Sequence, residues 1–143
     1  MSIVKTSKAL PYLLIIYSIA SLAHFIHNAE FLRDYPGLPA TWTRGGVYGA
    51  WLGMTAVGIF GWLLVRGRYP VVGLLLVCVY AALGMDSLGH YVVAPMAAHS
   101  SMMNVTILLE VAAGAAVFIV AATMIAAHAI KYRQRKPVPR GNS

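Results

Sequence analysis

Four long apolar blocks set the strongest limit on how this chain can fold. They run over residues 10–32, 47–65, 71–93 and 102–130. Each is close to the roughly 20 residues that a helix needs to cross the hydrocarbon core of a bilayer. The stretches between them contain Pro, Gly or charged residues, which forbid one continuous helix. The sequence therefore predicts an all-α polytopic membrane protein, an antiparallel bundle of four transmembrane helices in a single domain over residues 1–130.

Positive charge gathers on one side of the predicted bundle. Most of the formal net charge of +7 lies before the first block, between the second and third blocks, and after the fourth, at Lys5, Lys8, Arg66, Arg68, Lys131, Arg133, Arg135, Lys136 and Arg140. Because Lys and Arg are enriched on the cytoplasmic side of membrane proteins, we predict that both termini are cytoplasmic, in a bacterial inner membrane. Residues 131–143 form a basic tail without an apolar face, which we expect to be flexible.

The basic composition also bears on partners. These cations flank helices, and the chain lacks the clustered fold or aromatic platform that nucleic-acid readers use. We therefore predict contact with the lipid bilayer and no nucleic-acid partner. Small residues such as Gly46, Gly49 and Gly53 permit close helix approach, so a homodimer or a place in a larger membrane complex stays open.

Ionisable residues inside the apolar blocks are the most informative feature of the sequence. The chain has four acidic residues, and three of them, Glu30, Asp86 and Glu110, fall within or at the edge of a block. A carboxylate at the centre of a membrane helix costs about 2.5 to 3.5 kcal/mol, so such groups normally face the bundle interior and have a partner. Histidines lie near them at helical spacing, at His24, His27 and His90, with His99 in the following loop.

These groups predict a site in the outer half of the bundle, which is the half that faces away from the cytoplasm in the predicted orientation. Imidazole and carboxylate ligands suit zinc or iron, and a site with an open position can activate water or polarise a substrate oxygen. We expect His27, Asp86 and His90 to bind a divalent metal. Glu30 and Glu110 are the expected catalytic carboxylates, and His24 and His99 are possible additional ligands. The expected substrate is lipid-like or otherwise soluble in the membrane.

Other interpretations stay open from the sequence alone. A haem could lie between the first and third helices, held by His24 or His27 and by His90. The same residues could form a metal-free proton relay or a site for a transported or isomerised molecule. They could also hydrogen-bond across helices merely to fix their register. A non-catalytic accessory subunit of a larger membrane complex is a further alternative, so whether the protein is an enzyme is left undecided.

One short motif resembles a known family. The string from His27 through Glu30 to Phe31, near the end of the first predicted helix and followed by His90 at the end of the third, resembles the small bacterial membrane proteins named for a His-x-x-Glu-Glu motif. Phe31 stands where that family has its second Glu. The resemblance implies a chain of this size and helix count, with His27, Glu30 and His90 as site residues. It implies no particular reaction.

Overall fold

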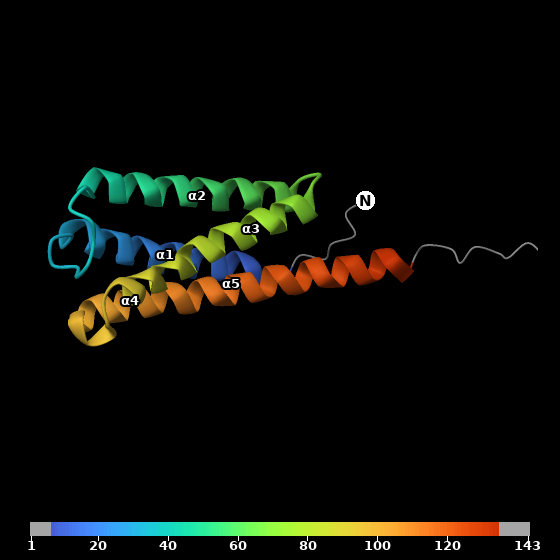
Figure 1. The fold of residues 1–143 in the computed structure, drawn as a ribbon. Coiled ribbons are helices and arrows are strands. Elements are labelled where there is room, and N and C mark those ends of the chain that lie inside the picture. The colour runs from blue at the N-terminus through green and yellow to red at the C-terminus, as the bar shows by residue number, and fades with distance from the viewer. Residues whose placement is uncertain (1–6, 135–143) are drawn as a thin grey trace, which may run out of the picture.

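The predicted bundle is present in the computed structural model, which describes residues 7–134. Its helices are α1 (Ala9–Glu30), α2 (Arg44–Arg66), α3 (Pro70–Met85), α4 (His90–Val93) and α5 (Ser101–Gln134). The long helices run antiparallel to their neighbours in sequence (Figure 1). Four stretches are long and apolar enough to span a membrane, with α3 to α4 forming one span over Pro70–Val93. The all-α, four-span fold class is therefore confirmed.

The two ends of the bundle differ. One end, called here the loop end, carries residues 31–43 and 94–100; the other, the terminus end, carries the α2–α3 turn and both ends of the described chain. At the terminus end, α5 continues to Gln134, so the first residues of the predicted flexible tail are helical. Lys5 and residues 135–143, with the rest of that tail, lie outside the described residues.

Local sequence signals explain where the helices begin. The side chain of Thr43 accepts a hydrogen bond from the backbone N–H of Gly46 at 3.1 Å, which caps the first turn of α2. Pro70 opens α3, where its missing N–H is not needed by the helix. The chain needs little else at these points, because an apolar run of this length forms a helix in lipid to satisfy its own backbone.

The third span is not one regular helix. Between α3 and α4, residues Asp86–Gly89 form a 3-10 turn, labelled η1. A second such turn, η2 (Met96–Ala98), lies in the following loop. The sequence pattern gave no sign of a break in this span, because its apolar residues run on to Val93. The tighter turn changes which side chains face the bundle interior, with consequences for the site below.

The interior of the bundle is centred on two tyrosines. Tyr17 on α1 and Tyr80 on α3 are both buried, with ring centres 4.6 Å apart, and the Tyr17 hydroxyl donates to the backbone oxygen of Tyr80 at 2.9 Å. Glycines make room for these rings. A Cβ at Gly84 would collide with the Tyr17 hydroxyl, and a Cβ at Gly58 would lie 2.5 Å from the Tyr80 ring. These glycines are therefore packing positions.

Helices α2 and α3 approach each other most closely near the terminus end. A Cβ placed on Gly73 of α3 would overlap the backbone nitrogen of Val65 and lie 2.6 Å from the carbonyl oxygen of Gly61, both on α2. Backbone meets backbone there without intervening side chains. Such small-residue contacts hold membrane helices together through van der Waals packing, because lipid supplies no hydrophobic drive between helices.

Candidate functional site

The site is built around Glu110, whose side chain is fully buried within α5. It lies nine residues after Ser101, so about 13 Å along the helix from the loop end. The Ser87 hydroxyl of η1 donates to Glu110 Oε2 at 2.5 Å, and Nε2 of His24 lies 3.8 Å from the same oxygen. Within residues 7–134, the other carboxylate oxygen, Oε1, is buried and has no hydrogen-bond partner. The buried Ser21 hydroxyl of α1 also interacts with this carboxylate and has no other partner among these residues.

His24 faces Glu110 with a nitrogen that carries no proton when the ring is neutral. Its other nitrogen, Nδ1, lies 3.3 Å from Thr106 Oγ1, and that hydroxyl donates its single proton to the backbone oxygen of Met103 at 3.0 Å. When the hydroxyl donates to Met103, Thr106 accepts from His24 Nδ1–H. This places the lone pair of Nε2 opposite Glu110. The imidazole and the carboxylate can each take up a proton at the same place in the bundle.

His90 continues the group of imidazoles. The amide nitrogen of Asn28 donates to His90 Nε2 at 3.3 Å, so the neutral ring carries its proton on Nδ1. That Nδ1 is buried and has no partner in the part of the chain that the structure describes. The ring centres of His24 and His90 lie 5.4 Å apart. α4 begins at His90, directly after the 3-10 turn, and the turn aims this ring at α1.

His99 connects the group to the loop end. It follows η2 and is 6% exposed. Its Nδ1 donates to the backbone oxygen of Pro95 at 3.1 Å, which leaves Nε2 without a proton and, in this structure, without a partner. The ring centres of His90 and His99 are 6.1 Å apart. His99, His90, His24 and Glu110 therefore form a continuous series from the loop into the bundle.

Tyr35, from the α1–α2 loop, packs into the middle of these rings. It is 3% exposed, and its ring centre lies 5.0 Å from that of His90. Burial raises the pKa of Tyr35 to about 12, so its hydroxyl stays protonated at neutral pH. It can then donate to Nδ1 of His27, 2.9 Å away. His27 thus contacts the group from the side through Tyr35.

Glu30 lies apart from this group. Its carboxylate forms an ion pair with Arg44 and accepts a hydrogen bond from Tyr48 at 2.7 Å, both at the start of α2, and its side chain is 37% exposed. Residues six apart on a helix differ by roughly 120° in direction. Glu30 therefore points away from the face of α1 that carries His24. In the sequence, His27 lies three residues from each of them.

Asp86 is also separate from the group, and the 3-10 turn explains why. In a regular α-helix, Asp86 and His90 would differ in direction by roughly 40° and would share a face. In a 3-10 turn each residue rotates by about 120°, so residues three apart share a face and residues four apart do not. Ser87 and His90 accordingly point inward, and Asp86 is exposed.

The predicted ligand set for a metal is consequently not gathered in one place. His90 lies in the group, His27 is at its edge behind Tyr35, and Asp86 points away. Within residues 7–134, no group of three or more His, Cys, Asp or Glu side chains is placed so that it could hold a metal ion. Metal binding stays a prediction.

Several residues of the site were not singled out from the sequence. These are Tyr35 of the α1–α2 loop, together with Asn28, Ser87 and Thr106. A polar side chain inside an apolar block is the one signal that could have found the last three, because such residues seek partners across helices. Glu110, His24, His90 and His99 were all predicted members, and the structure brings them together.

Comparisons with known proteins add no family. No protein-family model, curated protein or solved structure matches this chain. The resemblance to the His-x-x-Glu-Glu proteins, carried by His27, Glu30 and His90, thus stays a prediction. The described chain is a bundle of four candidate membrane spans with a buried histidine–glutamate pair.

Proposed function

We propose that this membrane protein performs acid–base chemistry at the His24–Glu110 pair, on a lipid-like or otherwise membrane-soluble substrate. The observation that carries the proposal is a fully buried carboxylate with one oxygen unpartnered among residues 7–134, facing an imidazole nitrogen 3.8 Å away. A carboxylate at this depth costs about 2.5 to 3.5 kcal/mol, and helix packing alone does not require it. A proton held at this pair can be given to, or taken from, a bound molecule.

The histidine series provides a route for that proton. His99 lies at the loop end, His90 follows, and His24 contacts Glu110, with neighbouring ring centres 5 to 6 Å apart. At such distances a water molecule or a small ring rotation completes each transfer. The unpartnered Nδ1 of His90 and Nε2 of His99 are the donor and acceptor that such a transfer uses.

The route has one entrance, which favours chemistry at the site over passage across the membrane. All four acidic residues of the chain lie in the half of the bundle next to the loop end or in its loops. The terminus half offers no carboxylate to continue the path from Glu110. A proton that reaches Glu110 is therefore used there or returns to the loop end.

We further propose that the loop end faces away from the cytoplasm. Lys8, Arg66, Arg68, Lys131 and Arg133 lie at the terminus end, against Arg33 and Arg44 at the loop end. The positive-inside bias then places the terminus end in the cytoplasm. A membrane-impermeant thiol reagent tests this on two single-cysteine chains in a Cys78→Ala background. Ser100→Cys should react from outside intact cells and Arg68→Cys should not, and the reverse would contradict the orientation.

Infrared spectroscopy of the protein in lipid tests the acid–base proposal. A protonated carboxylic acid absorbs apart from a carboxylate, so a pH titration should reveal a band that Glu110→Gln removes. The matched control, Glu30→Gln, changes a carboxylate that is exposed and paired with Arg44, and it should leave the band in place. A Glu110 that shows no change of protonation over the range in which the protein stays folded would overturn the proposal.

The histidine route has its own test in the same sample. Transfer into deuterated buffer shifts the carboxylic acid band as the proton exchanges. We expect His90→Phe to slow this exchange at least tenfold, because it interrupts the series. His27→Phe changes a ring that touches the series only through Tyr35, and it should leave the rate within about twofold. Equal rates in both variants would contradict the route.

A metal-assisted form of the site is the second candidate. Two buried imidazole nitrogens without partners, Nδ1 of His90 and Nε2 of His99, support it, since imidazole is a common zinc and iron ligand. Elemental analysis of the purified protein tests it. Near-stoichiometric zinc or iron that is lost in His90→Ala and in His99→Ala, but kept in His128→Ala at the other end of α5, would support a metal. Retention of the metal in all three would contradict it.

A further inference from the structure

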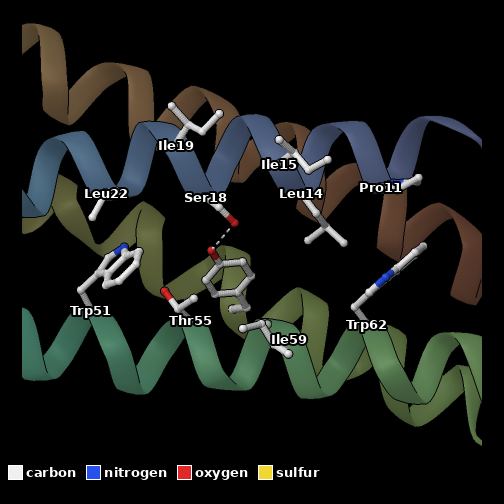
Figure 2. A pocket seen from close by; sticks show the side chains of 12 residues that line it. Pro11, Leu14, Ile15, Ser18, Ile19, Leu22, Trp51, Thr55, Ile59 and Trp62 are labelled. Atoms are coloured by element: carbon white, nitrogen blue, oxygen red, sulfur yellow. Dashed lines mark hydrogen bonds between the residues drawn. The ribbon is translucent and has the colours of Figure 1, made fainter.

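A second feature lies on the membrane-facing side of the bundle, apart from the acid–base pair. A groove of about 460 Å³ runs between α1 and α2. Residues from Pro11 to Leu22 form one wall, residues from Trp51 to Trp62 form the other, and Tyr80 of α3 forms the floor (Figure 2). Each wall advances by eleven residue steps along its helix, which makes the groove about 16 Å long. Neither His24 nor Glu110 lines it.

The floor of the groove explains why the two helices stay apart. The Tyr80 side chain passes close to Gly58 of α2 and reaches Ser18 of α1, where the two hydroxyls lie 3.1 Å apart (Figure 2). The ring occupies the space in which α1 and α2 would otherwise meet. The groove is thus fixed by a buried side chain and a hydrogen bond, and it does not depend on a flexible loop.

One end of the groove carries a polar atom that lacks a partner. The indole nitrogen of Trp51 is buried and has no hydrogen-bond partner within residues 7–134, whereas the nearby Thr55 hydroxyl interacts with Tyr80. The indole nitrogen is turned toward α1 across the groove (Figure 2). In a bilayer core, water is absent and an unsatisfied polar group is costly. A ligand oxygen that accepts from the indole N–H would remove that cost.

The remaining walls are apolar and open to lipid. Ile15, Ile19 and Ile59 are between 58% and 64% exposed along the groove. The volume falls within the range of small-molecule sites, which are mostly apolar with a few placed polar groups. An elongated hydrocarbon body would cover these side chains while its oxygen meets Trp51.

The depth of Trp51 in the membrane limits which lipophilic molecules can place an oxygen at its indole N–H. Trp51 lies seven residues after Arg44, so about 10 Å along α2 from the loop end. The polar groups of a phospholipid stay at the membrane surface, whereas this site needs an oxygen inside the hydrocarbon region. We propose that the groove binds a neutral single-chain lipophile, such as a long-chain or isoprenoid ketone, with its carbonyl oxygen at Trp51 and its chain extending toward Trp62.

Photolabelling in lipid nanodiscs tests this assignment. The probe is a long-chain methyl ketone with a diazirine in its chain, and labelled peptides are located by mass spectrometry. We expect saturable labelling of α1 and α2 that the unlabelled ketone suppresses and that an alkane of equal length does not. Labelling that fails to saturate, or that spreads evenly over the lipid-facing side of α5, would overturn the proposal.

Matched variants sharpen the result. Ile59→Trp fills the groove and should reduce saturable labelling at least fivefold, whereas Phe60→Trp, at an equally exposed position outside the groove, should not. Trp51→Phe removes the donor and should weaken binding about threefold, the equivalent of an average hydrogen bond within a membrane. Trp62→Phe, the same substitution at the apolar end, should have a smaller effect. Equal losses for Ile59→Trp and Phe60→Trp would contradict the site.

Discussion

Two helix contacts in this bundle are built in opposite ways. Between α2 and α3, Gly61 and Gly73 let backbone approach backbone without a polar side chain at the contact. Between α1 and α5, the contact is made by His24 and Glu110, which are buried and imperfectly paired at 3.8 Å. The first contact is close and satisfied, and the second leaves a carboxylate oxygen without a partner. The α2–α3 contact therefore stabilises the bundle, whereas the α1–α5 contact leaves polar groups available for chemistry.

The glycine contact should show the largest change in stability. Gly73→Ala places a Cβ against the backbone of Val65, which cannot move without separating α2 from α3. We expect the free energy of unfolding, measured by detergent titration, to fall by about 3 kcal/mol, at the upper end of typical overpacking costs. Gly53→Ala is the control, because within residues 7–134 its added Cβ would meet nothing closer than 4 Å apart from its own stretch of helix. A smaller loss for Gly73→Ala than for the control would contradict the stabilising role given to the α2–α3 contact.

At the His24–Glu110 contact, we expect a substitution to raise the free energy of unfolding. Glu110→Gln keeps the shape of the side chain and an acceptor for Ser87 while it removes a buried charge. We expect the free energy of unfolding to rise by about 1 kcal/mol, because the charge no longer has to enter the membrane. Glu30→Gln should change it by less than about 0.5 kcal/mol, since exposed ion pairs contribute little. A clear destabilisation by Glu110→Gln would mean that the pair serves packing.

The 3-10 turn gives a prediction that distinguishes two neighbouring residues. Ser87→Ala removes the donor to Glu110 and should lower the free energy of unfolding by about 1 kcal/mol. Asp86→Ala changes an exposed side chain and should stay within about 0.5 kcal/mol. The same two variants should differ in the infrared band of Glu110. If Asp86→Ala has the larger effect, the turn does not aim these side chains as described.

The smallest expected effect concerns the tyrosine core. Tyr17→Phe removes the hydroxyl that donates to the backbone of Tyr80. Hydrogen bonds between membrane helices average about 0.6 kcal/mol, so a loss of that size is expected in the same titration. Tyr12→Phe, on a side chain that is 69% exposed, is the matched control. A loss above about 2 kcal/mol would place this core, and not the α2–α3 contact, at the centre of stability.

The sequence predicts the helices well because each span is set by length and apolarity, which are properties of single residues. The first predicted block, residues 10–32, and α1 differ by two residues at most. The third span shows the limit of this approach. Its apolar pattern is the same for a regular helix and for a helix with a 3-10 turn. The pattern therefore does not show that Ser87, and not Asp86, faces the bundle interior.

The sequence predicts the site from residue type and from depth in the membrane. It predicts only partly which way each side chain points from its helix axis. Glu110 and His90 were found because ionisable groups are rare in such segments. His24 was ranked below His27, yet it is the residue that faces Glu110, because rotation about a helix axis depends on contacts with other helices. Tyr35 was missed for the same reason. A tyrosine in a loop has the composition of an interface residue until the loop is seen to fold inward.

The length of α5 has a consequence for how the protein meets bilayers of different thickness. Its 34 residues span about 51 Å, well beyond the roughly 30 Å of a hydrocarbon core, and the excess lies at the terminus end (Figure 1). Hydrophobic mismatch is accommodated where a helix can slide or tilt. A thinner or thicker membrane should therefore move the headgroup boundary along the last turns of α5, from about Ile130 onward, and leave the surroundings of Glu110 unchanged.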